Sequence, residues 1–172
     1  NVSYTNTQVA LYIQDDIRIR RNLSVTPGVR VETQTHIDGV VAGPRVGATW
    51  APFKNGKTTL RASWGIFYDW LPTNTYEQTL RIDGFQQREI NIANPTYPEP
   101  LFEISSATPA DRYLLDPNLK HPRNSRVSWG VDHAFSPRFR LNATYRYVQG
   151  EGLLRGLNLN APATGIRPPP GF

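Results

Sequence analysis

Residues 126–147 read RVSWGVDHAFSPRFRLNATYRY, and this stretch decides the fold because it alternates on both sides of a short turn. Mostly apolar side chains occupy the odd positions before and after Ser136–Arg138, and polar or small side chains occupy the even positions. Successive side chains of a β-strand point to opposite faces, so a period of two separates these sets. The stretch predicts two antiparallel strands with one apolar and one polar face.

The same alternation recurs in four earlier segments. The sequence therefore predicts an all-β fold, an antiparallel meander of about six long strands. The expected strands lie at residues 7–20, 22–33, 44–52, 58–69, 124–135 and 138–149. In each of them one face is aliphatic and aromatic, and the other is small, polar or charged. Asp15 is an exception on the apolar face, which a bulge or a position near a membrane boundary would explain.

The connections between these segments alternate in length. Three are short and lie at residues 20–22, 53–57 and 136–138, and Asn55-Gly56 in the second is a strong hairpin signal. Three are longer and lie at residues 34–43, at 70–123 and after Gln149. Outer-membrane barrels have short periplasmic turns and long extracellular loops. The alternation predicts three hairpins in an open section of a large transmembrane β-barrel, with 70–123 as an extracellular loop.

Strand length and aromatic placement agree with a membrane barrel, because most segments have the roughly 9–11 residues that a tilted strand needs to cross the bilayer. The expected lipid-facing or girdle residues are Trp50, Trp64, Tyr68, Trp129, Phe135, Phe139, Tyr145 and Tyr147, with Leu11, Val29 and Leu141 on the same face. The expected lumen-facing residues are Arg30, Arg45, Arg61, Arg126, Arg140 and Arg146. Phe67 also lies toward the long loop, where an aromatic girdle would be.

The composition excludes several classes of function. The chain of 172 residues has no cysteine, which removes disulfides, zinc–thiolate sites and thiol catalysis. The formal net charge is +5, but the arginines are spread singly and form no basic stripe for nucleic acid. The sequence contains no apolar run of about 18 residues, which a transmembrane helix would need. Methionine is also absent, and we expect an internal segment of a longer protein.

No side-chain pattern indicates catalysis, a metal or a cofactor. His36, His121 and His133 are far apart in sequence and have no ligand spacing to one another. Asp15 and Asp16 are adjacent, so in a strand they point to opposite faces and cannot act as a carboxylate pair. No nucleophile elbow, phosphate-binding loop or dinucleotide motif occurs. We therefore expect no enzyme activity.

The long connection at residues 70–123 is rich in both aromatic residues and proline. Such a composition is typical of an ordered loop without much regular structure. A short hairpin or a short helix could lie within Thr79–Ile92. Both a ligand-contacting lid and a passive structural cap are compatible with this loop.

Four stretches have a specific order and spacing: LYIQDDIR at 11–18, LSVTPGVRVE at 23–32, PRVGATWAPF at 44–53 and GKTTLRASWGIFYD at 56–69. Together they resemble the barrel hairpins of TonB-dependent outer-membrane receptors. DPNLK at 116–120 and LNLNAP at 157–162 resemble the Oar-like branch of that family. The resemblance covers most of the chain except the middle of the long loop.

The resemblance implies a barrel of roughly 22 strands in the bacterial outer membrane, closed by an N-terminal plug domain. It also implies opening by the TonB–ExbB–ExbD system and transport of a cargo, which the sequence does not identify. Residues 1–172 would be a partial barrel domain, with the plug domain outside this chain. The implied partners are outer-membrane lipid, the protein's own plug and the TonB system.

Two alternatives stay open at this point. One is another outer-membrane barrel of the porin or adhesin type, which would lack a plug domain upstream. The other is a soluble carbohydrate-binding β-sandwich, in which the tryptophans would be buried between two sheets. The barrel hypothesis further predicts that this chain alone is not a stable membrane protein, because an open sheet leaves its edge strands unpaired in lipid.

Overall fold

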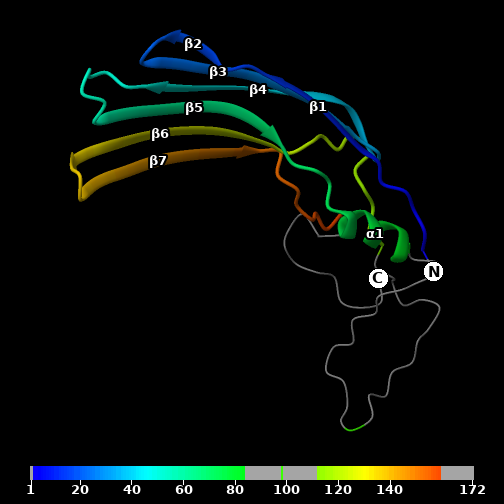
Figure 1. Ribbon diagram of the computed structural model, residues 1–172. Helices are drawn as coiled ribbons and strands as arrows, with labels where there is room; N and C mark the ends of the chain where they lie inside the picture. The colour runs from blue at the N-terminus through cyan, green and yellow to red at the C-terminus, as the bar shows by residue number, and fades with distance from the viewer. Residues whose placement is uncertain (1, 84–97, 99–111, 160–172) are drawn as a thin grey trace.

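The structure, a computed structural model, describes residues 2–83, 98 and 112–159 of the chain (Figure 1). All strands of this part belong to one antiparallel sheet in the order β1-β3-β4-β5-β6-β7, and β2 also pairs with β3. The elements are β1 (Gln8–Gln14), β2 (Ile17–Arg20), β3 (Leu23–Gln34), β4 (Ile37–Trp50), β5 (Thr58–Tyr68), α1 (Thr73–Arg81), β6 (Arg123–Ser136) and β7 (Phe139–Glu151). The predicted antiparallel meander is thus confirmed.

The three predicted hairpin turns are present, and they lie at one end of the sheet, opposite α1 and the N-terminus (Figure 1). The conformation of the turn between β4 and β5 explains why Asn55-Gly56 predicts a turn at this place. Gly56 has φ +65°, and its N–H donates to the Phe53 carbonyl at 3.1 Å. The Asn55 side chain accepts from the Lys57 N–H at 3.0 Å. We call this end of the sheet the turn end and the other the loop end.

The first predicted strand is divided into β1 and β2, and the cause is Pro27 of β3. Proline has no N–H to donate to the strand opposite it. The Asp15 N–H still donates to the Pro27 carbonyl at 3.1 Å, and the Asp15 carboxylate accepts from the Asp16 N–H at 2.8 Å. The last pair of β1 with β3 is Gln14 with Gly28, and the first pair of β2 with β3 is Ile17 with Val25. The gap between these two pairs contains the same number of residues on each strand. Of the two explanations that the sequence left open for Asp15, the bulge is therefore excluded.

The prediction of a longer connection at residues 34–43 is also wrong. Only Thr35-His36 joins β3 to β4, so the alternation of short and long connections has one exception. His36 has φ +74°, and a shift in register follows near Gly39, which has φ +104°. The sequence did not predict this part of β4 because Asp38 and the glycines interrupt its alternation of apolar and polar residues. Aspartate and glycine are uncommon in strands.

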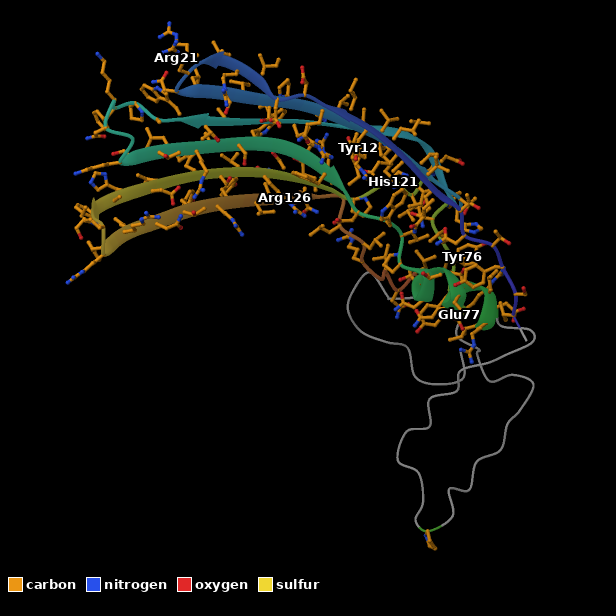
Figure 2. All side chains as sticks on the ribbon, in the orientation of Figure 1. Tyr12, Arg21, Tyr76, Glu77, His121 and Arg126 are labelled. Atoms are coloured by element: carbon orange, nitrogen blue, oxygen red, sulfur yellow. The ribbon has the colours of Figure 1, made fainter. Side chains whose placement is uncertain are left out.

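The buried apolar side chains of the described residues lie at the loop end and not along the middle of the sheet. Ile37 and Leu71 are 4% and 2% exposed. Helix α1 begins directly after Pro72, and its Tyr76 stacks on His36 with ring centroids 3.6 Å apart. Figure 2 shows Tyr76 at the loop end, far from Arg21 at the turn end.

Helix α1 lies inside the long connection but begins earlier than the Thr79–Ile92 segment considered from the sequence. Residues 84–92 of that segment lie outside the described residues. In the part of the chain that the structure describes, no helix has the length and apolarity needed to cross a membrane.

Candidate functional site

One face of the sheet is apolar and uncovered, and we call it the apolar face. Trp64 pairs with Val46 and Val127, and residues directly opposite in an antiparallel pair share a face. By the same register, this face carries Leu11, Val29, Trp50, Trp64, Tyr68, Trp129, Phe139, Leu141, Tyr145 and Tyr147. Phe135 is on this face too, because its ring contacts those of His133 and Phe139. All of the predicted lipid-facing residues therefore share one face.

Among the described residues, no second layer covers the tryptophans of the apolar face. Trp50, Trp64 and Trp129 are 46%, 41% and 61% exposed, and Leu11 is 72% exposed. A soluble β-sandwich would bury these side chains, and soluble proteins rarely expose so continuous an apolar surface. This observation rules out the sandwich that the sequence left open.

The opposite face carries the predicted lumen-facing arginines, and we call it the arginine face. Arg45 pairs with Gly28 and Gly65, and Gly65 pairs with Arg126, so these residues form one row across four strands. The other four predicted arginines have the same parity: Arg30, Arg61, Arg140 and Arg146. The register thus places all six predicted arginines on the face opposite the tryptophans.

Two of these arginines are held by carboxylates on the same face. Arg30 Nε lies 3.0 Å from Glu32 Oε1, and the Glu32 side chain is only 7% exposed. Arg61 Nη2 lies 2.8 Å from Asp132 Oδ2, and the two side chains are 49% and 35% exposed. Exposed ion pairs add little stability, typically about 0–1 kcal/mol. Their main effect here is to neutralise and orient these two guanidinium groups.

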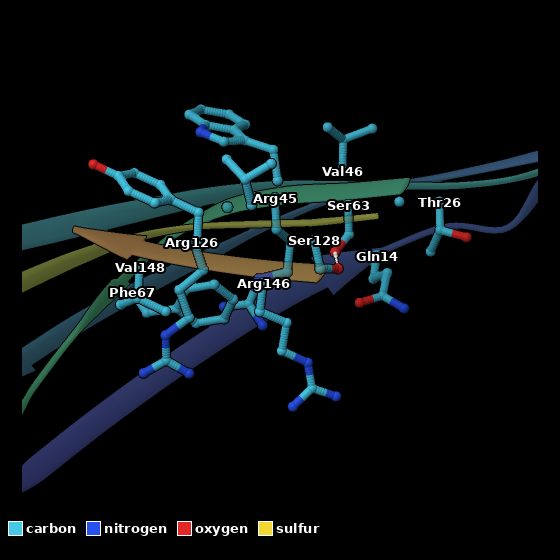
Figure 3. A pocket seen from close by; sticks show the side chains of 15 residues that line it. Gln14, Thr26, Arg45, Val46, Ser63, Phe67, Arg126, Ser128, Arg146 and Val148 are labelled. Carbon is cyan, nitrogen blue, oxygen red and sulfur yellow. Dashed lines mark hydrogen bonds between the residues drawn. The ribbon is translucent and has the colours of Figure 1, made fainter. Parts of the chain in front are cut away.

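Between the two ion pairs lies a hollow of about 390 Å³ on the arginine face (Figure 3). Arg45, Arg126 and Arg146 line it together with Phe67 and Gln14, and no acidic residue of the described chain does. Figure 3 shows Arg126 and Arg146 reaching to one side of the sheet and Val46 to the other.

The floor of this hollow depends on Gly65. The guanidinium carbons of Arg45 and Arg126 lie 5.1 and 4.7 Å from the centre of the Phe67 ring, within cation–π range. A Cβ at Gly65 would lie 3.0 Å from Arg45 Cβ and 3.1 Å from Phe67 Cε2. Because Gly65 has no side chain, the Phe67 ring and Arg45 have the space to pack against each other.

A second hollow of about 330 Å³ continues along the arginine face. Arg61, Ser63, Ser128 and Arg146 line it, and the Ser63 and Ser128 hydroxyls lie 2.7 Å apart across β5 and β6. The two hollows share Ser63, Ser128 and Arg146, so they form one continuous surface on the arginine face.

Sequence reasoning missed two features of these faces. Phe67 is on the arginine face and not in an aromatic girdle, which its odd position in β5 could have revealed. Arg123 has the parity of the apolar face, opposite Tyr68, and it forms an ion pair with Glu151 at the loop end. The Arg123 Nε donates to Glu151 Oε2 at 2.9 Å. Both charged residues lie in the row of Tyr68, at the loop end of the apolar face.

The histidines do not converge. His133 is on the apolar face, where its Nδ1 lies 2.8 Å from Thr58 Oγ1. His36 and His121 lie at the loop end, and His121 packs edge-on against Trp70. Within the described ranges, no three histidine, cysteine or carboxylate side chains are grouped so that they could hold a metal ion.

Two family models match the chain. The model of an outer membrane beta barrel domain matches residues 38–171. The model of a TonB dependent receptor-like beta-barrel matches residues 1–69. No curated protein matches the chain.

Two solved structures share the fold. The outer membrane transporter YddB from Escherichia coli has a TM-score of 0.61 and 18% identity, over 84% of this chain and 16% of that chain. A mutant of the ferric enterobactin receptor PfeA from Pseudomonas aeruginosa has a TM-score of 0.53 and 17% identity, over 84% of this chain and 18% of that one. The chain thus spans less than a fifth of either protein. At such low sequence identity, the similarity shows a shared fold and nothing more.

Proposed function

Because the chain belongs to the outer membrane beta barrel domain family, we propose that it is a wall segment of a TonB-dependent transporter for an unidentified cargo. The chain lies in the bacterial outer membrane, and the matched relatives are transporters and receptors and not enzymes. The match of residues 1–69 to the receptor barrel favours a receptor over a porin or adhesin barrel.

The observation that carries the proposal is the division of the sheet into two faces. The apolar face contacts lipid, because its exposed aromatic and aliphatic side chains lose contact with water there. The arginine face lines the lumen, because an arginine near the bilayer midplane would cost about 2–4 kcal/mol. The aromatic pair Phe135 and Phe139, with ring centroids 5.4 Å apart, forms part of a girdle at the turn end.

The two ends of the sheet face different compartments. The turn end lies in the periplasm and the loop end outside the cell, as the lengths of turns and loops in outer-membrane barrels imply. The long connection with α1 is then an extracellular loop, and residues 1–172 are part of one barrel domain.

The partners follow from the proposed membership in the TonB-dependent family. The complete protein carries a plug domain that fills the barrel beside the arginine face, and the TonB–ExbB–ExbD system opens it. Within that family we assign the chain to the Oar-like branch, on the strength of DPNLK at 116–120 and LNLNAP at 157–162.

A test uses single cysteines at two positions of β7, three residues apart, in the complete protein and in a background without other cysteines. Leu141→Cys is on the apolar face and Thr144→Cys is on the arginine face. A charged, water-soluble thiol reagent should label residue 144, and a lipid-soluble maleimide should label residue 141 preferentially. Equal labelling of both positions by the charged reagent would contradict the membrane placement of the sheet.

A further inference from the structure

The cluster of Arg45, Arg126 and Arg146 differs from the other arginines of its face. Arg30 and Arg61 each have a carboxylate partner within 3.0 Å. No ion pair involves the three clustered arginines within the described part of the chain, and no carboxylate lines their hollow. Like charges this close repel one another, so the cluster is most stable with an anion nearby.

The cluster is also organised before any ligand arrives. The Phe67 ring lies within cation–π range of both Arg45 and Arg126, and Gly65 provides the space for this packing. The Nε of Arg45 is buried and has no hydrogen-bond partner in the described structure. Buried donors are almost always paired, so this nitrogen indicates a missing acceptor.

We propose that Arg45, Arg126 and Arg146 form a binding site for an oxyanion, a carboxylate or phosphate group, inside the barrel. This inference rests on the proposed function, which places the arginine face in the lumen. The planar guanidinium presents paired N–H donors that match the two oxygens of such a group. Thr26 and Gln14 at the edge of the hollow offer further polar atoms.

The volume of the hollow limits the ligand. At about 390 Å³ it lies at the small end of the range for ligand pockets, so it suits one small anionic group. That group has two possible sources. It is either a carboxylate side chain from another part of the complete protein or a diffusible anion that enters the lumen.

Chemical modification of arginine by phenylglyoxal distinguishes these sources. The complete protein is treated in detergent, and mass spectrometry gives the modification rates of Arg126 and Arg146, with Arg138 as the reference. Arg138 is exposed on a short turn and has no ion-pair partner among the described residues. We expect the two clustered arginines to react about tenfold more slowly than Arg138 when the anion is bound.

Slow reaction without additives, reversed by about 1 M sodium chloride, supports a carboxylate of the protein itself, because salt screens ionic contacts. Slow reaction only after citrate is added supports a diffusible anion. Rates equal to that of Arg138 in every condition overturn the proposal, and so does protection that salt and citrate leave unchanged.

Failure of this site is separable from failure of the proposed function. Thr144→Cys reports whether the arginine face is in water, independently of any anion. If the charged thiol reagent labels residue 144 but Arg126 and Arg146 show no anion dependence, only the oxyanion site is wrong. If residue 144 is not labelled, the lumenal placement itself is wrong.

Discussion

The side-chain amide of Gln34 makes two hydrogen bonds with the backbone of Leu71, 37 residues further along the chain. The Leu71 N–H donates to Gln34 Oε1 at 2.8 Å, and Gln34 Nε2 donates to the Leu71 carbonyl at 3.1 Å. Both residues are nearly inaccessible to solvent, at 4% and 2% exposure. This contact joins the end of β3 to the start of the segment that carries α1.

Replacing Gln34 by leucine should loosen the base of the long loop. The Leu71 N–H and carbonyl would stay buried without partners, and each such group costs about 1–3 kcal/mol. We expect faster tryptic cleavage after Arg81 in the complete protein, measured by the appearance of the fragment with time. Gln14→Leu is the matched control, because Gln14 is exposed and should leave the rate unchanged. Equal rates in the two variants would show that the amide does not hold the loop.

An arginine should be tolerated on one face of the sheet and not on the other. Trp129→Arg places a charge on the apolar face, whereas Thr144→Arg places it on the arginine face of the neighbouring strand. We expect Trp129→Arg to lower the free energy of unfolding by about 2–4 kcal/mol and Thr144→Arg to change it little. Urea unfolding of the complete protein in lipid vesicles measures both. A larger loss for Thr144→Arg would reverse the assignment of the faces.

Gly43 and Gly47 lie on the same face of β4 but differ in their surroundings. A Cβ at Gly43 would lie 2.5 Å from the Ile66 carbonyl oxygen, whereas the nearest atom at Gly47 is Thr26 Cβ at 3.9 Å. Gly43→Ala should cost about 1–3 kcal/mol of stability, because the backbone of β5 must move. Gly47→Ala should stay within about 0.5 kcal/mol of the unchanged protein. The midpoint of urea unfolding tests this, and similar midpoints for the two variants would refute it.

The two ends of the sheet should differ in accessibility from the cell surface. Gln78 is exposed on α1 at the loop end, and Lys54 is exposed in a short turn. On intact cells, a membrane-impermeant thiol reagent should label Gln78→Cys and should label Lys54→Cys only after the outer membrane is permeabilised. Surface labelling of Lys54→Cys alone would mean that the barrel has the opposite orientation.

The alternation of side chains, which is a local property, was enough to predict both faces. Trp129 and Arg126 fall on opposite faces because a strand has a period of two, whatever its neighbours are. The turn at Asn55-Gly56 was likewise predictable, because its positive φ is a local preference of glycine. The sequence alone therefore determined the antiparallel meander, three of its hairpin turns and the separation of the six predicted arginines from the tryptophans.

The tertiary structure decided the features that depend on residues far apart in sequence. Pro27 interrupts the pairing opposite Asp15, and β4 extends back to Ile37, because strand ends depend on the partner strand as well as on local preference. The Phe67 ring meets Arg45 and Arg126 only after β4, β5 and β6 pair in register. Periodicity assigns a side chain to a face, but only the register between strands determines which side chains meet there.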